Sequence, residues 1–338
     1  TSVTIGSGVT GIGERGFDSC SNLTSITVKA TTPPTLAYYV FDNTNNCPIY
    51  VPCESVNTYK SASMWGNYSS RIYALDCPHK FDATYTGGTS YYKYCDGSTT
   101  LTSGDTSPSN SYPHSGMTTV SVGNCVTNIG DGAFYYCTKL SSVTLSDSVT
   151  SIGLRAFRDC RRLESIDIPS GVTSISGSAF YYCTSLTSIT IPDSVTNFGN
   201  MVFYGAGLTS CTIGSGVTTI GFNTFYNCTG LTRVNSNVDG LCNIPDSVRS
   251  IGDEAFYHCA SLTSIDIPSG VTSIGYSAFY QCTSLTSITV NATTPPTISY
   301  DTFNASNNCP IYVPAGSVDT YKAASNWSNY ASRIQAIP

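Results

Sequence analysis

A single pattern of apolar and polar positions recurs along most of the 338-residue chain. Each copy contains Ser-Val-Thr-Ser-Ile-Gly, then Ala-Phe-x-x-Cys, then Leu-Thr-Ser-Ile-x-Ile-Pro, or a close variant. The valine that marks each copy stands at Val9, Val126, Val149, Val172, Val195, Val217, Val248 and Val271. The three intervals from Val126 to Val195 are each 23 residues long. A fixed period of roughly 20–30 residues predicts a solenoid, in which each unit buries its apolar face only against its neighbours.

The copy at residues 172–192 shows which elements one repeat predicts. Leu-x-x-Ile-x-Ile at residues 186–191 is the strand signature of a leucine-rich repeat, and its alternation places Ser188 and Thr190 on the exposed sheet face. Pro192 lacks a backbone N–H and ends that strand. The apolar spacing in residues 179–183 predicts a short helical or 3₁₀ turn on the opposite side of the coil. The predicted fold class is therefore an α/β solenoid of leucine-rich repeats with a parallel sheet on one side.

Each copy fills the same core positions again. The repeated phenylalanines are Phe17, Phe134, Phe157, Phe180, Phe203, Phe225, Phe256 and Phe279. The repeated leucines are Leu23, Leu140, Leu163, Leu186, Leu208, Leu231, Leu262 and Leu285. A glycine follows Ile152, Ile251 and Ile274, and we expect a turn there with a positive φ, which glycine adopts without steric cost. Extra residues around Asn235–Leu241 interrupt the period, and we interpret them as a surface loop.

Seven of the 15 cysteines follow the repeat phenylalanine by three residues. They are Cys20, Cys137, Cys160, Cys183, Cys228, Cys259 and Cys282. Because equivalent positions of a solenoid lie on one another, we expect these thiols to form a reduced column in the interior, packing as small apolar groups. Cys53, Cys77 and Cys95 lie in or near segments without the repeat, where a disulfide remains an alternative.

A longer duplication indicates the domain organisation. The segment from Lys29 to Ile72 matches the segment from Asn291 to Ile334, including Cys-Pro-Ile-Tyr-Val-Pro and a short helix that begins after a serine. A solenoid needs such a cap, because its last repeat would otherwise expose core. Residues 1–75 are predicted to be the C-terminal end of a first array with its cap. Residues 117–290 form a second array and residues 291–338 a C-terminal cap with a helix.

The segment between the arrays, residues 76–116, lacks the repeat. Residues 81–92 predict two strands joined by a Gly-Gly turn. Residues 103–115 are rich in Ser, Pro and Asn and predict a linker. We therefore expect a small β insert between the two arrays.

The composition excludes several classes of function. Charged residues make up 11% of the chain and the formal net charge is −6, without a run of Lys or Arg, so neither nucleic acid nor an anionic membrane surface is a predicted partner. The chain contains no stretch of 18 apolar residues that would predict a membrane span. Because Thr1–Gly6 reads as the tail of a repeat strand, we expect the sequence to be part of a longer chain.

These repeats resemble the BspA-like leucine-rich-repeat surface proteins of anaerobic bacteria of the mouth and gut. The resemblance rests on Ser-Val-Thr-Ser-Ile-Gly, Ala-Phe-x-x-Cys and Leu-Thr-Ser-Ile-x-Ile-Pro over most of residues 1–30 and 117–290, and on the Cys-Pro-Ile-Tyr-Val-Pro segment of the cap. It implies a secreted or surface-anchored protein that adheres to host matrix proteins or to other cells. It does not identify a ligand, because function lies on variable exposed positions rather than on the scaffold.

Two exposed surfaces are candidate binding sites. The first is the outward column of the predicted sheet, rich in hydroxyl groups and nearly uncharged. Its residues are Ser142, Thr144, Ser165, Asp167, Ser188, Thr190, Ser210, Thr212, Arg233, Asn235, Ser264, Asp266, Ser287 and Thr289, of which the ten from Ser165 to Asp266 are the candidate site. The alternative is that Ser and Thr only solvate a regular sheet.

The second candidate is the tyrosine that follows the repeat phenylalanine. This tyrosine row comprises Tyr135, Tyr181, Tyr204, Tyr226, Tyr257 and Tyr280. Aromatic side chains with one apolar face and one polar tip suit sugar rings or a protein partner. The alternative is that they shield neighbouring repeats from water.

The sequence offers little chemistry for catalysis. The three histidines, His79, His114 and His258, are far apart and have no metal-ligand spacing, and no cofactor motif is present. Asp167 and Asp266 occupy equivalent positions four copies apart, beyond the ~5–10 Å that a glycosidase pair requires. We therefore expect a non-enzymatic protein without cofactors, and the family resemblance implies that it binds a host or microbial surface or matrix protein. A glycan-binding module and a structural spacer without a ligand are the alternatives.

Overall fold

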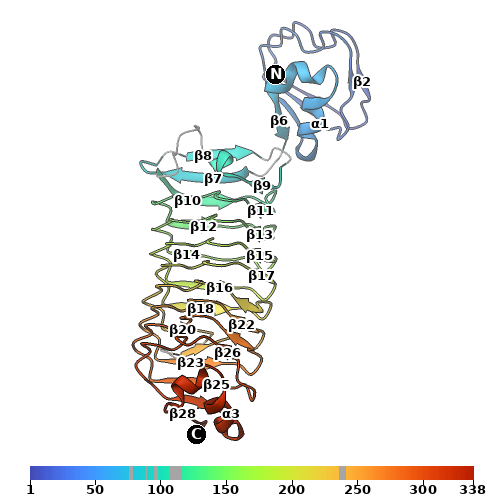
Figure 1. Ribbon diagram of the computed structural model, residues 1–338. Coiled ribbons are helices and arrows are strands. Elements are labelled where there is room, and N and C mark those ends of the chain that lie inside the picture. The colour runs from blue at the N-terminus through green and yellow to red at the C-terminus, as the bar shows by residue number, and fades with distance from the viewer. Residues whose placement is uncertain (76–78, 89, 95–97, 107–115, 236–240) are drawn as a thin grey trace. The chain divides into compact units, whose positions relative to one another are not determined.

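The computed structural model describes residues 1–75, 79–88, 90–94, 98–106, 116–235 and 241–338. Over the described residues each unit winds into β-solenoid coils of about 23 residues per turn, about 13 turns in all, which confirms the predicted fold class (Figure 1). Two compact units are distinguished by their internal contacts. The first comprises Thr1–Asp82, Tyr92–Thr99 and Gly123–Cys125, and the second comprises Ala83–Tyr91, Thr100–Val122 and Val126–Pro338.

One side of the coils in the second unit carries the strands of the Leu-x-x-Ile-x-Ile signature, which we call the broad side. Its two sheets have the orders β14-β12-β10-β7-β8 and β16-β18-β20-β21-β23-β25-β27-β28. The strands are β7 (His79–Tyr85), β8 (Ser90–Tyr94), β10 (Met117–Val122), β12 (Ser142–Thr144), β14 (Ser165–Ile166), β16 (Ser188–Ile191), β18 (Ser210–Ile213), β20 (Arg233–Val234), β21 (Leu241–Asn243), β23 (Ser264–Ile267), β25 (Ser287–Val290), β27 (Ile311–Val313) and β28 (Ile334–Ala336).

The strands of the broad side pair in parallel with like residues on like. Ser188 lies beside Ser210 and Thr190 beside Thr212. Ile189 and Ile191 are buried, whereas Ser188 and Thr190 are exposed, so the alternation that the sequence predicts is present. The strand ends before Pro192, as expected. Each coil thus buries its apolar residues between its own two sides and against the coils before and after it.

A second set of short parallel strands lies on another side of the coils, which we call the narrow side. It shows that the predicted turn at Ile-Gly is wrong. Its sheets have the orders β17-β15-β13-β11-β9 and β19-β22-β24-β26. The strands are β9 (Thr100–Leu101), β11 (Asn128–Ile129), β13 (Ser151–Ile152), β15 (Ser174–Ile175), β17 (Asn197–Phe198), β19 (Thr219–Ile220), β22 (Ser250–Ile251), β24 (Ser273–Ile274) and β26 (Thr297–Ile298). Ile152, Ile251 and Ile274 therefore end strands of a second sheet rather than leading into a glycine turn.

The glycine that follows these strands is required by close packing and not by backbone conformation. The expectation of a positive φ after these isoleucines is wrong, because Gly153 and Gly275 do not have one. A Cβ on Gly153 would lie 2.6 Å from Asp131 Oδ1 of the preceding coil, nearer than side-chain atoms approach one another. Positive φ occurs two residues later instead, for example at Arg155 (φ 56°) and Ser277 (φ 47°).

The Ala-Phe-x-x-Cys segment forms a series of turns without a continuous helix. Cys137 N donates to Phe134 O within the coil at 3.2 Å, which is the i→i−3 bond of the predicted 3₁₀-type turn. Phe134 N donates instead to Ala156 O of the next coil at 2.8 Å. Alternating bonds within and between coils therefore satisfy this backbone without helix or strand.

The repeat phenylalanines form one stacked column through the second unit. Ring centroids of successive residues lie 5.0–5.7 Å apart from Phe134 to Phe303, and Phe157 and Phe180 are parallel to within 1°. These side chains are fully buried. The ring offset at such distances is the geometry that aromatic pairs prefer.

In the second unit the cysteine column lies in the interior as reduced thiols, as predicted. Cys160 Sγ donates to Phe134 O of the preceding coil at 3.2 Å, and Cys183, Cys228, Cys259 and Cys282 make the equivalent bond. The thiol is thus also a hydrogen-bond donor between coils. Cys20 of the first unit is exposed, contrary to the prediction.

The first unit repeats the same arrangement on a smaller scale. Its broad-side sheet has the order β1-β3-β5-β6, with β1 (Ser2–Ile5), β3 (Ser25–Val28), β5 (Ile49–Pro52) and β6 (Ile72–Leu75). Its narrow-side strands are β2 (Gly11–Ile12) and β4 (Thr35–Leu36). A core of its own surrounds Phe41 and Trp65. Cys53, which follows β5, and Cys125 are both disulfide-bonded. Cys77 and Cys95 lie outside the described residues.

The two caps are built by equivalent contacts. In the second unit, α3 (Val318–Ala323) and the 3₁₀ helix η5 (Trp327–Tyr330) follow β27, and Trp327 Nε1 donates to Pro296 O at 2.7 Å. In the first unit, α1 (Val56–Ser61) and η2 (Trp65–Arg71) follow β5, and Trp65 Nε1 donates to Pro34 O at 2.7 Å. Ser55 and Ser317 hold the N-cap positions without a side-chain capping bond.

The segment between the arrays is described in part. β7 and β8 are neighbours in the strand order β14-β12-β10-β7-β8, and the turn after β7 has Gly87 (φ 94°) and Gly88 (φ 81°). The short helix α2 (Ser103–Thr106) lies within the predicted linker, of which residues 107–115 are outside the described residues. Of the extra residues that interrupt the period, residues 236–240 also lie outside the described residues, and Leu241 begins β21.

We predict that Phe256→Ala disrupts the second unit locally. Phe256 is fully buried and stacks between Phe225 and Phe279, so its truncation leaves a cavity in a column that cannot close without bending the coils. The expected loss is ~3–5 kcal/mol in the free energy of unfolding, measured by urea denaturation. Phe222→Ala, at a position 40% exposed, is the matched control and should cost less than about 1 kcal/mol. Equal midpoints for both variants would contradict the assigned column.

The buried thiols predict a loss of stability in alkali. Burial raises the pKa of Cys228 and of Cys282 from 9.0 to about 12, because the thiolate cannot be hydrated in the core. Between pH 9 and 12 the unfolded chain therefore loses thiol protons that the folded chain keeps, and stability falls as the pH rises. Urea midpoints at pH 8 and pH 10.5 measure this fall. Cys228→Ala should make it smaller, whereas Cys20→Ala, which removes an exposed thiol, should leave it unchanged.

Candidate functional site

The structure places the predicted outward column on the broad side of the second unit. Ser165, Asp167, Ser188, Thr190 and Thr212 are exposed. The half-buried members are Ser210, Arg233, Asn235, Ser264 and Asp266. Parallel register brings Ser210 beside Arg233, but β21 enters the sheet between β20 and β23. Asn243 of β21, rather than Asn235, is therefore the neighbour of Asp266.

A small hollow of about 220 Å³ lies over the first part of this column. Six predicted residues line it, namely Ser165, Asp167, Ser188, Thr190, Ser210 and Thr212. Its polar groups are five hydroxyls and one carboxylate, and the aliphatic floor comes from the inward strand positions. Such a surface offers hydrogen-bond donors and acceptors without a strong local charge.

A larger hollow of about 700 Å³ continues from it at the end of the strands. The predicted residues that line it are Thr190, Thr212, Asn235 and Asp266. Residues that we did not predict line it as well, namely Asp193, Asn243, Asp246 and Asn291. They lie at the strand ends and in the turns that follow, where the repeat varies. The one sequence signal that could have indicated these residues is that they follow the strands that carry the predicted column.

The polar groups of the larger hollow are held in place by the coils around them. Asn235 Nδ2 donates to Ile213 O at 2.8 Å, and its Oδ1 accepts from Ile213 N at 2.7 Å, so the amide extends the sheet ladder. Asn291 Nδ2 donates to Asp266 Oδ1 at 2.5 Å. Asp193 Oδ1 accepts from Ser215 N at 2.7 Å, and this bond lowers the pKa of Asp193 by favouring the carboxylate. The hollow therefore presents oriented amides and carboxylates.

Catalytic or metal-binding chemistry has little support in the described part of the chain. No group of three or more His, Cys, Asp or Glu residues there is arranged to hold a metal ion. His258 Nδ1 lies 2.9 Å from Asn227 Oδ1, a contact between neighbouring coils. His114 lies outside the described residues. In the ranges described, no helix is both long and apolar enough to cross a lipid bilayer.

The tyrosine row forms a second stacked column beside the phenylalanines. Centroids of Tyr181, Tyr204, Tyr226, Tyr257 and Tyr280 follow one another at 4.5–5.2 Å with interplanar angles of 5–17°. All are half-buried, and burial raises the pKa of Tyr204 to about 12. Because each ring covers the face of the next, the column offers edges and hydroxyl groups to a ligand, and not the ring faces that stack on sugars.

Tyr135 is separated from the rest of the row by an arginine. In the intervening coil Arg158 takes the tyrosine position, and its guanidinium carbon lies 4.3 Å from the centroid of Tyr181. This cation–π contact closes one end of the stack. The tyrosine row is therefore interrupted by a positive charge, which the sequence analysis did not predict.

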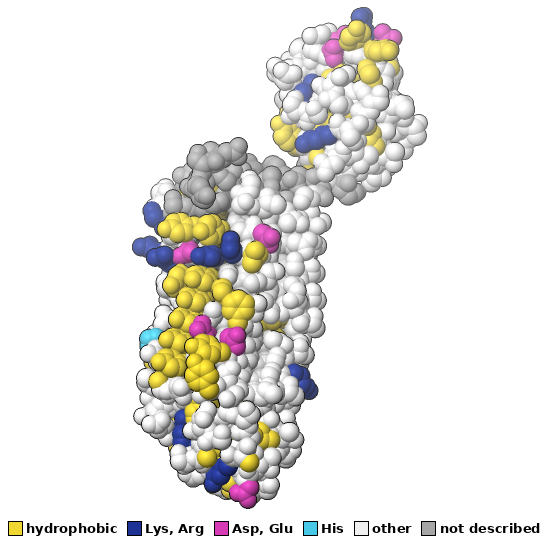
Figure 2. All heavy atoms as spheres, in the orientation of Figure 1, with side chains coloured by type: hydrophobic (Ala, Val, Ile, Leu, Met, Phe, Trp, Pro, Cys, Tyr) yellow, Lys and Arg dark blue, Asp and Glu magenta, His cyan; other side chains and the backbone are white. Residues whose placement is uncertain are grey.

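Arg158 belongs to a cluster of cations that the sequence analysis missed, which we call the arginine band. It comprises Lys139, Arg155, Arg158, Arg161 and Arg162. Figure 2 shows Lys and Arg side chains crossing the hydrophobic stripe on this face of the second unit. The signal was present in the sequence, since Leu-Arg-Ala-Phe-Arg-Asp-Cys-Arg-Arg carries four arginines in one repeat. A search for unbroken runs of charge overlooked it.

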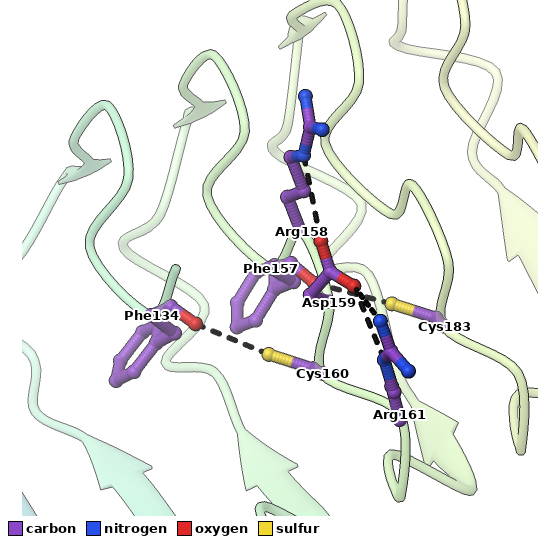
Figure 3. A network of polar contacts seen from close by, with 7 residues as sticks. All are labelled: Phe134, Phe157, Arg158, Asp159, Cys160, Arg161 and Cys183. Atoms are coloured by element: carbon purple, nitrogen blue, oxygen red, sulfur yellow. Dashed lines mark hydrogen bonds and ion pairs between the residues drawn. The ribbon is translucent and has the colours of Figure 1, made fainter. Parts of the chain in front are cut away.

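Asp159 orders two side chains of the arginine band (Figure 3). Its Oδ1 accepts from Arg161 Nη2 at 2.9 Å and from Arg161 Nε at 3.2 Å. Its Oδ2 lies 3.5 Å from Arg158 Nε in an ion pair. The Asp159 side chain is only 8% exposed, whereas that of Arg161 is 55% exposed. A nearly buried carboxylate thus fixes two arginines at the surface.

Comparison with known proteins identifies the repeats. The model of the BspA type leucine rich repeat region matches six copies over residues 1–96, 106–232 and 237–326. A search of curated proteins finds no match. A leucine-rich repeat protein from Bacteroides ovatus is similar in structure, with a TM-score of 0.42, 21% identity and coverage of 100% of this chain and 92% of that one.

Two further solved structures are similar. The Treponema pallidum (T. pallidum) leucine rich repeat protein TpLRR has 25% identity and a TM-score of 0.38, with coverage of 57% of this chain and 83% of that one. A leucine rich cell surface protein from Faecalibacterium prausnitzii has 22% identity and a TM-score of 0.35, with coverage of 85% and 86%. The family model, which matches nearly the whole sequence, decides the assignment: this chain belongs to the BspA type leucine-rich-repeat family.

Proposed function

We propose that this protein is a non-enzymatic secreted or cell-surface protein that mediates adhesion or protein–protein binding through the broad side of its second unit. The partner would be a host or microbial surface or matrix protein. The observation that carries the proposal is the continuity of the two hollows, which share Thr190 and Thr212 and extend along the predicted column. A long, nearly uncharged and regularly hydrogen-bonding surface suits an extended protein contact.

The cysteines support an oxidising location. Cys53 and Cys125 are disulfide-bonded, and disulfides persist mainly in secreted and cell-surface proteins. The thiols of Cys228 and Cys282 are compatible with such a compartment, because they are buried and burial raises their pKa to about 12, which keeps them protonated and unreactive toward oxidants. Membership of the BspA type family points in the same direction.

A glycan is the second candidate ligand, and the larger hollow favours it over the tyrosine row. A volume of about 700 Å³ falls in the usual range of small-ligand sites, and its oriented Asp and Asn groups match the hydroxyls of a sugar. The tyrosine rings are stacked on each other and leave few faces for a sugar ring. A glycan site would therefore lie in the hollow at Asp193, Asn243 and Asp266.

The intact chain should bind a protein of a matrix and cell-surface panel, measured by surface plasmon resonance beside a glycan array. Thr190→Arg with Thr212→Arg should weaken this binding at least about tenfold, because two long side chains fill the hollows. Thr196→Arg with Thr218→Arg adds the same charge at exposed positions next to the narrow side and should leave binding unchanged. Binding only on the glycan array would favour the second candidate, and binding to neither would favour a spacer.

A further inference from the structure

The arginine band concentrates positive charge in a chain whose net charge is −6. Five of the 15 Lys and Arg residues lie within residues 139–162. Lys139 and Arg162 are equivalent positions of adjacent coils, whose strands pair with the same offset at Ser142 and Ser165. Coils in register lie about 4.8 Å apart, so the five cations share a compact surface.

The internal counter-charge is too small for this cluster. Asp159 engages Arg158 and Arg161. Lys139, Arg155 and Arg162 are exposed, and among the described residues their side chains have no hydrogen-bond acceptor. Two other carboxylates lie near the band: Asp131 already accepts a bond from Leu154 N at 2.7 Å, and the exposed Glu164 follows Arg162 by two residues. Three carboxylates thus face five cations. Three cations therefore remain available to an external anion.

The band is partly pre-organised for such an anion. Asp159 holds the Arg161 guanidinium, and the Tyr181 ring holds that of Arg158, so less side-chain entropy is lost on binding. Guanidinium groups bind carboxylates through two parallel hydrogen bonds, which gives them direction as well as charge. The arrangement is suited to carboxylates presented in a row.

The surroundings of the band favour a protein over a polysaccharide. Tyr136 is 49% exposed and Leu154 is 42% exposed on the same two coils. Exposed Tyr and Leu beside Arg can bury apolar side chains of a partner, and Tyr and Arg dominate the energetics of protein interfaces. Sugar rings would need open aromatic faces, and the Tyr181 face toward the band is covered by Arg158.

We propose that the arginine band binds an acidic segment of a partner protein, in which Asp or Glu residues alternate with apolar ones. The inference rests on the proposed protein-binding function and adds a second contact area on another side of the coil from the hollows. Arg155 and Arg162 supply free guanidinium groups, Arg158 and Arg161 supply ordered ones, and Tyr136 with Leu154 supplies the apolar contact.

The test uses the intact chain and a fluorescein-labelled peptide of repeated Glu-Glu-Leu units, with fluorescence anisotropy as the readout. We expect saturable binding that weakens with added NaCl, and no binding of the Gln-Gln-Leu peptide. Arg155→Gln with Arg162→Gln should weaken binding about tenfold, since two charge-assisted contacts are lost. Arg249→Gln with Lys322→Gln removes the same charge elsewhere in the second unit and should leave the affinity unchanged.

Three results would overturn the inference. Equal losses in the two double variants would show attraction to net charge alone. Dextran sulfate or a single-stranded oligonucleotide competing at far lower concentrations than the Glu-Glu-Leu peptide would indicate a different polyanion. The third result is a panel protein that loses binding with Thr190→Arg and Thr212→Arg but not with Arg155→Gln and Arg162→Gln. It would refute binding at the arginine band and leave the proposed binding at the hollows standing. If no panel protein binds while the peptide still requires Arg155 and Arg162, the proposed adhesion fails and the acidic specificity of the band stands.

Discussion

The hydrogen bond between one coil and the next is the interaction on which the rest of this structure depends. Phe134 N reaches Ala156 O across the turns, and Ser188 pairs with Ser210 across the sheet. These bonds keep equivalent residues in register, so that phenylalanine stacks on phenylalanine and each thiol meets the carbonyl of the coil before it. A coil in isolation would leave these groups unsatisfied, so each coil depends on the coils beside it.

The same register separates scaffold from function. Inward positions must repeat, because any change of volume is felt by the two neighbouring coils. Outward positions are free to vary, and the candidate sites lie where they do so. The larger hollow contains Asn243 where other strands have Thr, and Asn291 where other coils have the proline that follows the strand. The arginine band places charge where other coils have Ser, Thr or Tyr. Binding specificity in such a fold is therefore a property of a few coils.

The exposure of the candidate column could be predicted because a strand alternates strictly. Ser188 and Thr190 face outward for the same reason that Ile189 and Ile191 face inward. The role of the glycines could not be predicted, because the constraint on Gly153 comes from Asp131 of another coil rather than from its own backbone. The tyrosine row was visible as a pattern, but only the stacking distances show that its ring faces are covered.

The sequence by itself determined the repeat, the period and the buried columns of the second unit, because each of these follows from residues that recur at a fixed spacing. Only the tertiary structure decided how irregular residues meet. β21 separates Asn235 from Asp266, the hollow collects side chains from several turns, and Asp159 anchors Arg158 and Arg161. The physical reason is that a periodic pattern encodes like-on-like contacts, whereas contacts between unlike residues depend on the packing of particular neighbouring coils.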